Sequence, residues 1–228
     1  MRRFPTSLLP SKGQSVRLSV ETSHHLLRVV GIAPNEQVEL FDGVGHGCVA
    51  ALSGVVDGLA EMVWVDDLLL PESRPALTMV LALTKGDAFT NALRMCTEIG
   101  VTRFVPLLCQ RSIAKGDKRP RWTKIVTGAS AQSKRLQIPT VLPLQTWSTL
   151  WDCLAEDETR WVLHPMMSGV PSVTTIVEPT TVFIGPEGGF TESEMTMMTE
   201  QGATYRSLGP LVLKADTAAI VASALALS

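Results

Sequence analysis

The sequence lacks the cysteine pattern of a disulfide scaffold or a metal site. Its 228 residues include four cysteines, which are widely scattered and form no CxxC pair: Cys48, Cys96, Cys109 and Cys153. No cysteine and histidine residues cluster at metal-ligand spacing, so the sequence predicts no bound metal. We expect reduced thiols in a core that a chain of this length buries without disulfides.

The sequence also lacks a long apolar run. The longest, AAIVASALAL near the C-terminus, is about half of what a bilayer crossing requires. The N-terminal stretch MRRFPTSLLPSKGQ is basic but has no continuous apolar segment of the kind found in signal peptides. We therefore expect a cytoplasmic protein with no membrane partner.

Common catalytic and nucleotide-binding motifs are missing as well. There is no GxxxxGK[ST] loop and no GxSxG elbow, and the adjacent His24 and His25 do not form a HExxH pair. One GxGxG run, DGVGHG at 42–47, has no helix predicted after it. It is typical of a hairpin turn, in which glycine is favoured.

The charged content of 18% is ordinary for a soluble globular protein and the net charge is only −2, but the basic residues concentrate in one stretch. Between residues 111 and 135 a single acid, Asp117, accompanies eight basic residues: Arg111, Lys115, Lys118, Arg119, Arg121, Lys124, Lys134 and Arg135. Two interpretations remain open, a solvated helix face and a surface that binds phosphates.

The chain divides near residue 72. Before this point, four short runs are predicted as strands, at 15–20, 37–43, 47–55 and 61–70, and turn signals separate them, which indicates a small barrel. LPESRP, at 70–75, carries two prolines and charge and is typical of a linker. We expect one domain over residues 1–72 and a second over 73–228.

The second part alternates strands and helices. Strands are predicted over 77–85, 102–110, 161–165, 181–185 and 204–209, and helices over 87–100, 119–135, 191–202 and 215–227. Thr191 and Glu194 fit a capping box at the start of the third helix. This alternation predicts an α/β fold with a mostly parallel sheet covered on both faces, in which ligands bind outside the carboxyl ends of the strands.

Three stretches rich in glycine or proline follow predicted strands at such ends: LHPMMSG (163–169), IGPEGGF (184–190) and LGPLVLKADTA (208–218). Glycine allows a ligand to approach the main chain closely. Loops of this kind suit a flat, hydrogen-bonding group such as adenine, held by backbone atoms between apolar walls.

Four stretches carry a family resemblance: TKGDAFTNALRMCTEIGV, RWTKIVTGASAQSKRLQIPTV, FIGPEGGFTESE and LGPLVLKADTAAIVA. In this order, after a strand-rich N-terminal part, they resemble the ribosomal RNA small subunit methyltransferase E family of the SPOUT superfamily. The resemblance covers nearly the whole chain. It implies a PUA-like β-barrel that binds RNA, followed by a SPOUT α/β domain with a C-terminal trefoil knot.

The resemblance also implies an activity. It is the transfer of a methyl group from S-adenosyl-L-methionine to N3 of one uridine in 16S ribosomal RNA, by a homodimer that acts on the RNA or the small ribosomal subunit. The implied cofactor-binding residues are Leu163, His164, Gly185, Pro186, Glu187, Gly188, Gly189, Leu208, Gly209 and Leu213. The expected RNA-binding residues are Arg2, Arg3, Lys85, Arg111, Arg121 and Arg135.

The sequence leaves the general base open between Glu187 and Asp216, and Glu187 has the alternative role of binding loop amides. It also departs from the family, because Leu211, Lys214 and Asp216 stand where members commonly have two arginines and a glutamate. Lysine lacks the planar fork of arginine. These changes keep open a SPOUT enzyme that acts on a different RNA. A second alternative is a noncatalytic RNA-binding protein of the same fold, against which the glycine-rich loops argue.

Overall fold

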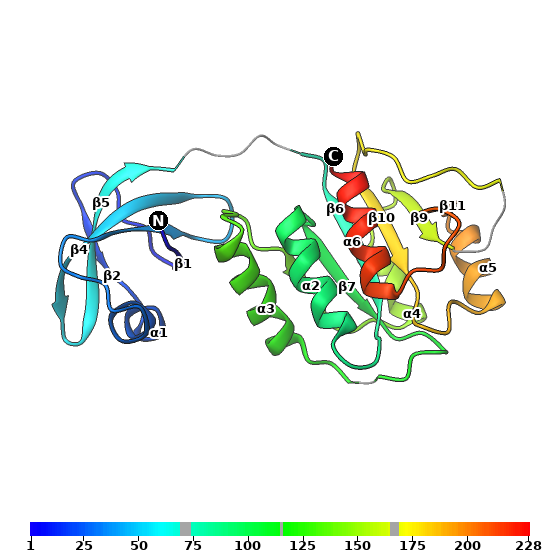
Figure 1. Ribbon diagram of the computed structural model, residues 1–228, viewed down its shortest axis with the longest axis horizontal. Coiled ribbons are helices and arrows are strands. Elements are labelled where there is room, and N and C mark those ends of the chain that lie inside the picture. The colour runs from blue at the N-terminus through cyan, green and yellow to red at the C-terminus, as the bar shows by residue number, and fades with distance from the viewer. Residues whose placement is uncertain (69–73, 115, 165–168) are drawn as a thin grey trace. The chain divides into compact units, whose positions relative to one another are not determined.

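The computed structural model describes residues 1–68, 74–114, 116–164 and 169–228 (Figure 1). The chain forms two compact units. Unit 1 comprises Met1–Glu72 together with Thr127–Ile138, and unit 2 comprises Ser73–Val126 together with Pro139–Ser228. Residues 70–73 of the predicted linker lie outside the described residues.

Unit 1 is built on a mixed five-stranded sheet with the order β1-β3-β4-β5-β2. Its strands are β1 (Arg3–Pro5), β2 (Ser15–Arg17), β3 (Gln37–Phe41), β4 (Gly47–Val56) and β5 (Leu59–Asp67). β1 runs parallel to β3, and the other pairs are antiparallel. The predicted strands at 37–43 and 47–55 are confirmed as β3 and β4. The predictions at 15–20 and 61–70 correspond to β2 and β5, although residues 69 and 70 lie outside the described residues, and β1, of three residues, was not predicted.

A helical segment in unit 1 also escaped prediction. Ser19 Oγ accepts a hydrogen bond from the amide of Thr22 at 3.2 Å and starts α1 (Val20–His24), which continues as the π-helical η1 (His25–Val30). The predicted strand at 15–20 is therefore cut short. Only Ser23 and Leu26 of the segment are buried, so its apolar periodicity is too weak to indicate a helix.

The DGVGHG run forms the predicted hairpin turn between the antiparallel strands β3 and β4. Asp42 Oδ1 accepts hydrogen bonds from the amides of Val44, Gly45 and His46 at 2.8 to 3.1 Å. Burial raises the pKa of Asp42, but these hydrogen bonds outweigh it and hold the pKa below its usual value. The run is a turn stabilised by its own aspartate.

Unit 2 contains a six-stranded parallel sheet with the order β11-β9-β10-β6-β7-β8. Its strands are β6 (Leu77–Ala82), β7 (Arg103–Leu107), β8 (Thr140–Val141), β9 (Thr159–Leu163), β10 (Thr180–Ile184) and β11 (Thr204–Arg206). The predicted parallel sheet is thus confirmed. β8, which has two residues, was not predicted.

Helices cover both faces of this sheet. On one face α2 (Ala88–Ile99) packs against α6 (Ala215–Ala226), as Figure 1 shows. On the other, Leu150 of α4 (Trp147–Leu150) and Met198 of α5 (Glu192–Glu200) join Val80, Val105 and Phe183 in one buried cluster. The short helix η2 (Trp151–Cys153) follows α4.

The last helix is α3 (Arg119–Gln132), which the sequence predicted. Its Trp122 packs on Phe89 of α2 with ring centroids 4.9 Å apart. Across the described residues, no helix has the length and apolarity that a membrane crossing requires.

One buried carboxylate holds part of unit 1 together. Glu39 of β3 pairs with Arg3 Nε at 2.8 Å and with Lys134 Nζ at 3.1 Å. The Arg3 guanidinium also donates to the Lys134 carbonyl. Burial raises the pKa of Glu39, but the hydrogen bonds and charges of Arg3 and Lys134 outweigh it and lower the pKa. Residues 127–138 are thereby tied to the sheet.

Replacing Glu39 with glutamine is expected to destabilise unit 1 by roughly 2–3 kcal/mol, because two cations lose a partly desolvated partner. Since the folded-state pKa is lowered, this stabilisation exists above the ordinary carboxyl value of 4.5 and is lost as the pH falls through the lowered pKa. Urea unfolding near neutral pH and well below pH 4.5 measures both effects. Glu61→Gln on β5 is the control, and equal losses in both variants contradict the prediction.

Candidate functional site

The carboxyl ends of β9, β10 and β11 are neighbours, because β9 pairs with both of the other strands. The loop after β9 begins with the half-buried Leu163 and His164, and residues 165–168 of LHPMMSG lie outside the described residues. The His164 amide donates to the Arg206 carbonyl at 3.4 Å, and its ring stands edge-on to Tyr205. This loop therefore starts in contact with β11.

The same loop returns to the end of β11 further along the chain. The Ser207 amide donates to the Pro171 carbonyl at 2.9 Å, and the Val173 amide donates to the Ser207 carbonyl at 3.1 Å. The segment after β9 is thus tied by backbone hydrogen bonds to the end of β11, directly before the third predicted ligand loop.

The GPEGG loop after β10 is a tight turn. The Gly189 amide donates to the Pro186 carbonyl at 2.8 Å, and Gly189 has a φ of 67° that favours glycine. A Cβ added to Gly185 meets the Phe190 ring at 3.2 Å. Phe190 is itself buried in the core. The start of the loop therefore packs closely against a buried side chain at its end.

Glu187 links this loop to the segment after β6. Its Oε1 accepts a hydrogen bond from the Lys85 amide at 2.9 Å, while both residues are exposed. The Glu187 carboxylate thus accepts a hydrogen bond from a loop amide, which is the alternative role expected from the sequence. Its assignment as a general base stays a prediction.

Arg111 lies against the GPEGG loop. Its Nη1 donates to the carbonyl of Gly188 at 2.7 Å and to that of Phe190 at 3.4 Å. A Cβ added to Gly188 meets the Arg111 side chain at 3.3 Å. The absence of a side chain at Gly188 therefore makes room for this arginine.

The loop after β11 is more exposed. Leu208 and Leu213 are half-buried, and Gly209 has a φ of 114°. Two apolar side chains face solvent, since Leu211 is 74% and Val212 is 69% exposed. The loop leads into α6, whose first turn carries Asp216.

The buried carboxylate of Glu194 holds the residue that follows the IGPEGGF stretch, Thr191. Its Oε1 accepts hydrogen bonds from the Gln110 amide at 2.8 Å and from Trp147 Nε1 at 2.9 Å, and its Oε2 accepts one from the Thr191 amide at 2.8 Å. The predicted capping box is confirmed. The sequence did not reveal the two long-range donors, because nothing local links them to Glu194.

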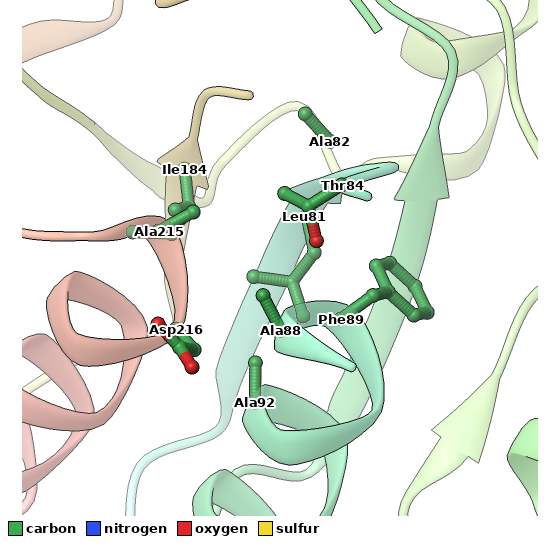
Figure 2. A pocket seen from close by; sticks show the side chains of 9 residues that line it. All are labelled: Leu81, Ala82, Thr84, Ala88, Phe89, Ala92, Ile184, Ala215 and Asp216. Atoms are coloured by element: carbon green, nitrogen blue, oxygen red, sulfur yellow. The ribbon is translucent and has the colours of Figure 1, made fainter. Parts of the chain in front are cut away.

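A small cavity of about 10 Å³ lies between the first turns of α2 and α6 (Figure 2). Its walls are mostly apolar, with Leu81, Ala88 and Ile184 among them, but Thr84 and Asp216 add polar atoms. The Thr84 hydroxyl is buried and has no hydrogen-bond partner among the described residues. No sequence pattern marked Thr84.

The predicted RNA-binding residues belong to both units. Unit 1 contains Arg2, which is exposed, and Arg3, whose side chain is 7% exposed and paired with Glu39. It also contains Arg135, whose pKa burial lowers to about 10. Unit 2 contains Lys85, Arg111 and Arg121, which are all exposed.

Metal ligands are not gathered at the site. The described residues contain no group of three or more His, Cys, Asp or Glu side chains arranged to hold a metal ion.

Comparisons with known proteins identify the fold and the family. Residues 71–227 match the family model of the RNA methyltransferase domain. The chain is 32% identical over 222 residues to a ribosomal RNA small subunit methyltransferase E from Synechocystis, covering 92% of this chain and 72% of that protein. The protein of that name from Mycobacterium bovis is 31% identical, with 96% and 88% covered.

Solved structures agree. The crystal structure of a ribosomal RNA small subunit methyltransferase E from Neisseria gonorrhoeae, bound to S-adenosyl methionine, matches with a TM-score of 0.89 at 30% identity, covering 98% of this chain and 95% of that one. A putative methyltransferase from Legionella pneumophila, in complex with the same cofactor, matches with a TM-score of 0.84 at 28% identity, covering 97% and 94%.

Fold and loops thus define an RNA methyltransferase domain. More specifically, the chain belongs to the ribosomal RNA small subunit methyltransferase E family.

Replacing Glu194 with glutamine is expected to cost roughly 2–3 kcal/mol of stability, because one side-chain oxygen is replaced by an amide that accepts no hydrogen bond. Urea unfolding measures the loss. Glu192→Gln is the matched control, since Glu192 is exposed in the same helical turn, and it should change stability by less than about 0.5 kcal/mol. Equal stability of the two variants contradicts the role given to Glu194.

Proposed function

We propose that the protein transfers a methyl group from S-adenosyl-L-methionine to N3 of a specific uridine in 16S ribosomal RNA. The observation that carries this proposal is the adjacency of the carboxyl ends of β9, β10 and β11, each of which precedes a predicted ligand loop. The fold of this chain is also similar over 98% of its length to that of the Neisseria gonorrhoeae family member bound to S-adenosyl methionine.

The residues present fit the cofactor. Gly189 and Gly209 have positive φ values and an added Cβ meets no atom within 4 Å, so their backbone is open to a ligand. The half-buried Leu163, Leu208 and Leu213 supply apolar surface beside them. We assign these residues, with His164, Gly185, Pro186, Glu187 and Gly188, to the adenosyl group. When bound, the cofactor supplies a methyl group activated by its sulfonium, so the protein must chiefly align the two reactants.

A basic surface on α3 supports RNA binding. Lys118, Arg119, Arg121 and Lys124 are exposed, and within the described residues none of them forms an ion pair. The single acid nearby, Asp117, accepts hydrogen bonds from the amides of Arg119 and Leu144. These cations are therefore available for phosphates, which they attract by charge.

The proposal extends to assembly and organisation. Residues 1–72 form the PUA-like barrel that helps to hold RNA, and residues 73–228 form the SPOUT domain, whose ligand loops are tied into a trefoil knot. The active species is a cytoplasmic homodimer, and its partner is 16S rRNA or the small subunit. Arg2, Lys85, Arg111 and Arg135 contact RNA, whereas Arg3 supports the fold through Glu39.

One observation favours a second candidate target. Leu211 is 74% exposed on the loop after β11, at a position where the family commonly carries an arginine. A loop without this cation binds phosphate less well, so methylation of a different RNA is the alternative.

Titration calorimetry with S-adenosyl-L-methionine tests the enzyme class. Saturable binding is expected, because the backbone at Gly189 and Gly209 is open to a ligand. No heat of binding at millimolar ligand contradicts the enzyme and favours a noncatalytic RNA-binding protein.

Mapping of 16S rRNA from a deletion strain then tests the target, since one N3-methyluridine should disappear. If that mark persists, the target is another RNA.

Replacing both Arg121 and Lys124 by alanine is expected to weaken RNA binding. The slope of log K against log salt concentration should become shallower by about 1–2, because each lost phosphate contact removes nearly one unit of slope. Filter binding at several salt concentrations measures both. Arg94→Ala, an exposed arginine of α2, serves as the control. A double variant with an unchanged salt slope excludes this surface from the RNA interface.

A further inference from the structure

The buried hydroxyl of Thr84 is the starting point. Thr84 is 6% exposed, and its Oγ1 is buried without a hydrogen-bond partner in the described part of the chain. Buried polar atoms in folded proteins are nearly always paired, with protein or with ordered water. This hydroxyl therefore requires a partner that the described residues do not supply.

The cavity beside Thr84 has the size of one water molecule. Its volume of about 10 Å³ is close to the minimum that holds a single water, provided that two or more polar groups face it. Thr84 and Asp216 are the polar side chains of its lining (Figure 2). The other lining side chains are apolar, so these two groups determine what binds there.

Two helix N-termini add to the polarity of the cavity. Ala88 and Ala215, the first residues of α2 and α6, both line it. Neither helix has a side-chain cap, since Asp87 and Lys214 form no capping hydrogen bond. The first-turn amides of α2 therefore have no side-chain acceptor and lie at the positive end of the helix dipole, whereas in α6 the Thr217 amide donates to Asp216 Oδ1.

The Asp216 carboxylate can accept a further hydrogen bond. Its Oδ1 accepts a hydrogen bond from the Thr217 amide at 3.0 Å, whereas Oδ2 makes no hydrogen bond within the described residues. Among the side chains that line the cavity, it is the titratable one. Figure 2 shows Asp216 on α6 and Thr84 beyond the end of β6, with Ala88 and Ala92 of α2 lining the same space.

We propose that the cavity holds one ordered water, bound by Thr84 Oγ1 and the Asp216 carboxylate, and that this water orients Asp216 as the acceptor of the uridine N3 proton. The inference rests on the proposed function. In the reaction the N3–H bonding pair stays on N3, which forms the new bond to the methyl carbon. The pair of the broken methyl–sulfur bond stays on sulfur, and the proton moves to Asp216. Thr84 is then a positioning residue.

Two substitutions at Thr84 separate this role from simple packing. Thr84→Val removes the hydroxyl at nearly constant volume, and Thr84→Ser retains it. Crystal structures should show one water in the cavity of the wild type and of Thr84→Ser, and none in Thr84→Val. The single-turnover rate of methylation should fall about 10- to 100-fold in Thr84→Val, and about 100-fold or more in Asp216→Asn. The affinity for S-adenosyl-L-methionine should stay unchanged, and Thr84→Ser should restore the rate.

Thermal unfolding gives a readout that is independent of activity. If the water is bound, Thr84→Val loses its hydrogen bond and melts at a lower temperature. If the cavity is dry, removal of an unpaired hydroxyl leaves the melting temperature unchanged or raises it. A dry cavity in wild-type protein that methylates 16S rRNA overturns the inference alone, as does a Thr84→Val variant of wild-type rate. Wild-type protein that binds the cofactor but does not methylate 16S rRNA contradicts the proposed function, and the inference fails with it.

Discussion

The site depends on the hydrogen bonds that the buried carboxylate of Glu194 accepts. A charge at 2% exposure is costly unless it is hydrogen-bonded, and here three N–H donors surround it, from the segment after β7, from Trp147 and from its own helix cap. Since α5 starts directly after the GPEGG loop, fixing its first turn fixes the end of that loop. Phe190, packed between Gly185 and the core, fixes the rest.

Hydrogen bonds of a similar kind tie the site segments to neighbouring parts of unit 2. Glu187 binds the Lys85 amide, Arg111 binds the Gly188 carbonyl, and Ser207 exchanges backbone hydrogen bonds with residues 171 and 173. Each contact connects segments far apart in sequence. The GPEGG loop is therefore held by the segments after β6 and β7, and the segment after β9 is held by the end of β11. The Thr84 cavity lies between the first turns of α2 and α6.

Much of the fold was predictable from local sequence. Strong signals, such as the buried run of β6, the apolar face of α2 and the capping box at Thr191, led to correct elements because they are encoded within a few residues. The misses were segments with little apolar periodicity: β1, β8, α4 and the helix from Val20 to Val30. Arg3 looked like a free cation next to Arg2, but its pairing with Glu39 depends on the alignment of β1 with β3.

By itself, the sequence determined the alternation of strands and helices, the glycine positions of the ligand loops and, through four ordered motifs, the family. These properties follow from local backbone preferences and residue order. Only the tertiary structure decided which groups are paired. It gave Glu187 and Glu194 their backbone partners and placed Arg111 against Gly188. Among the described residues it left the Thr84 hydroxyl without a partner, in a cavity that Asp216 also lines. Hydrogen bonding acts through distances of a few ångströms in space, and sequence separation does not reveal which distant groups the fold brings that close.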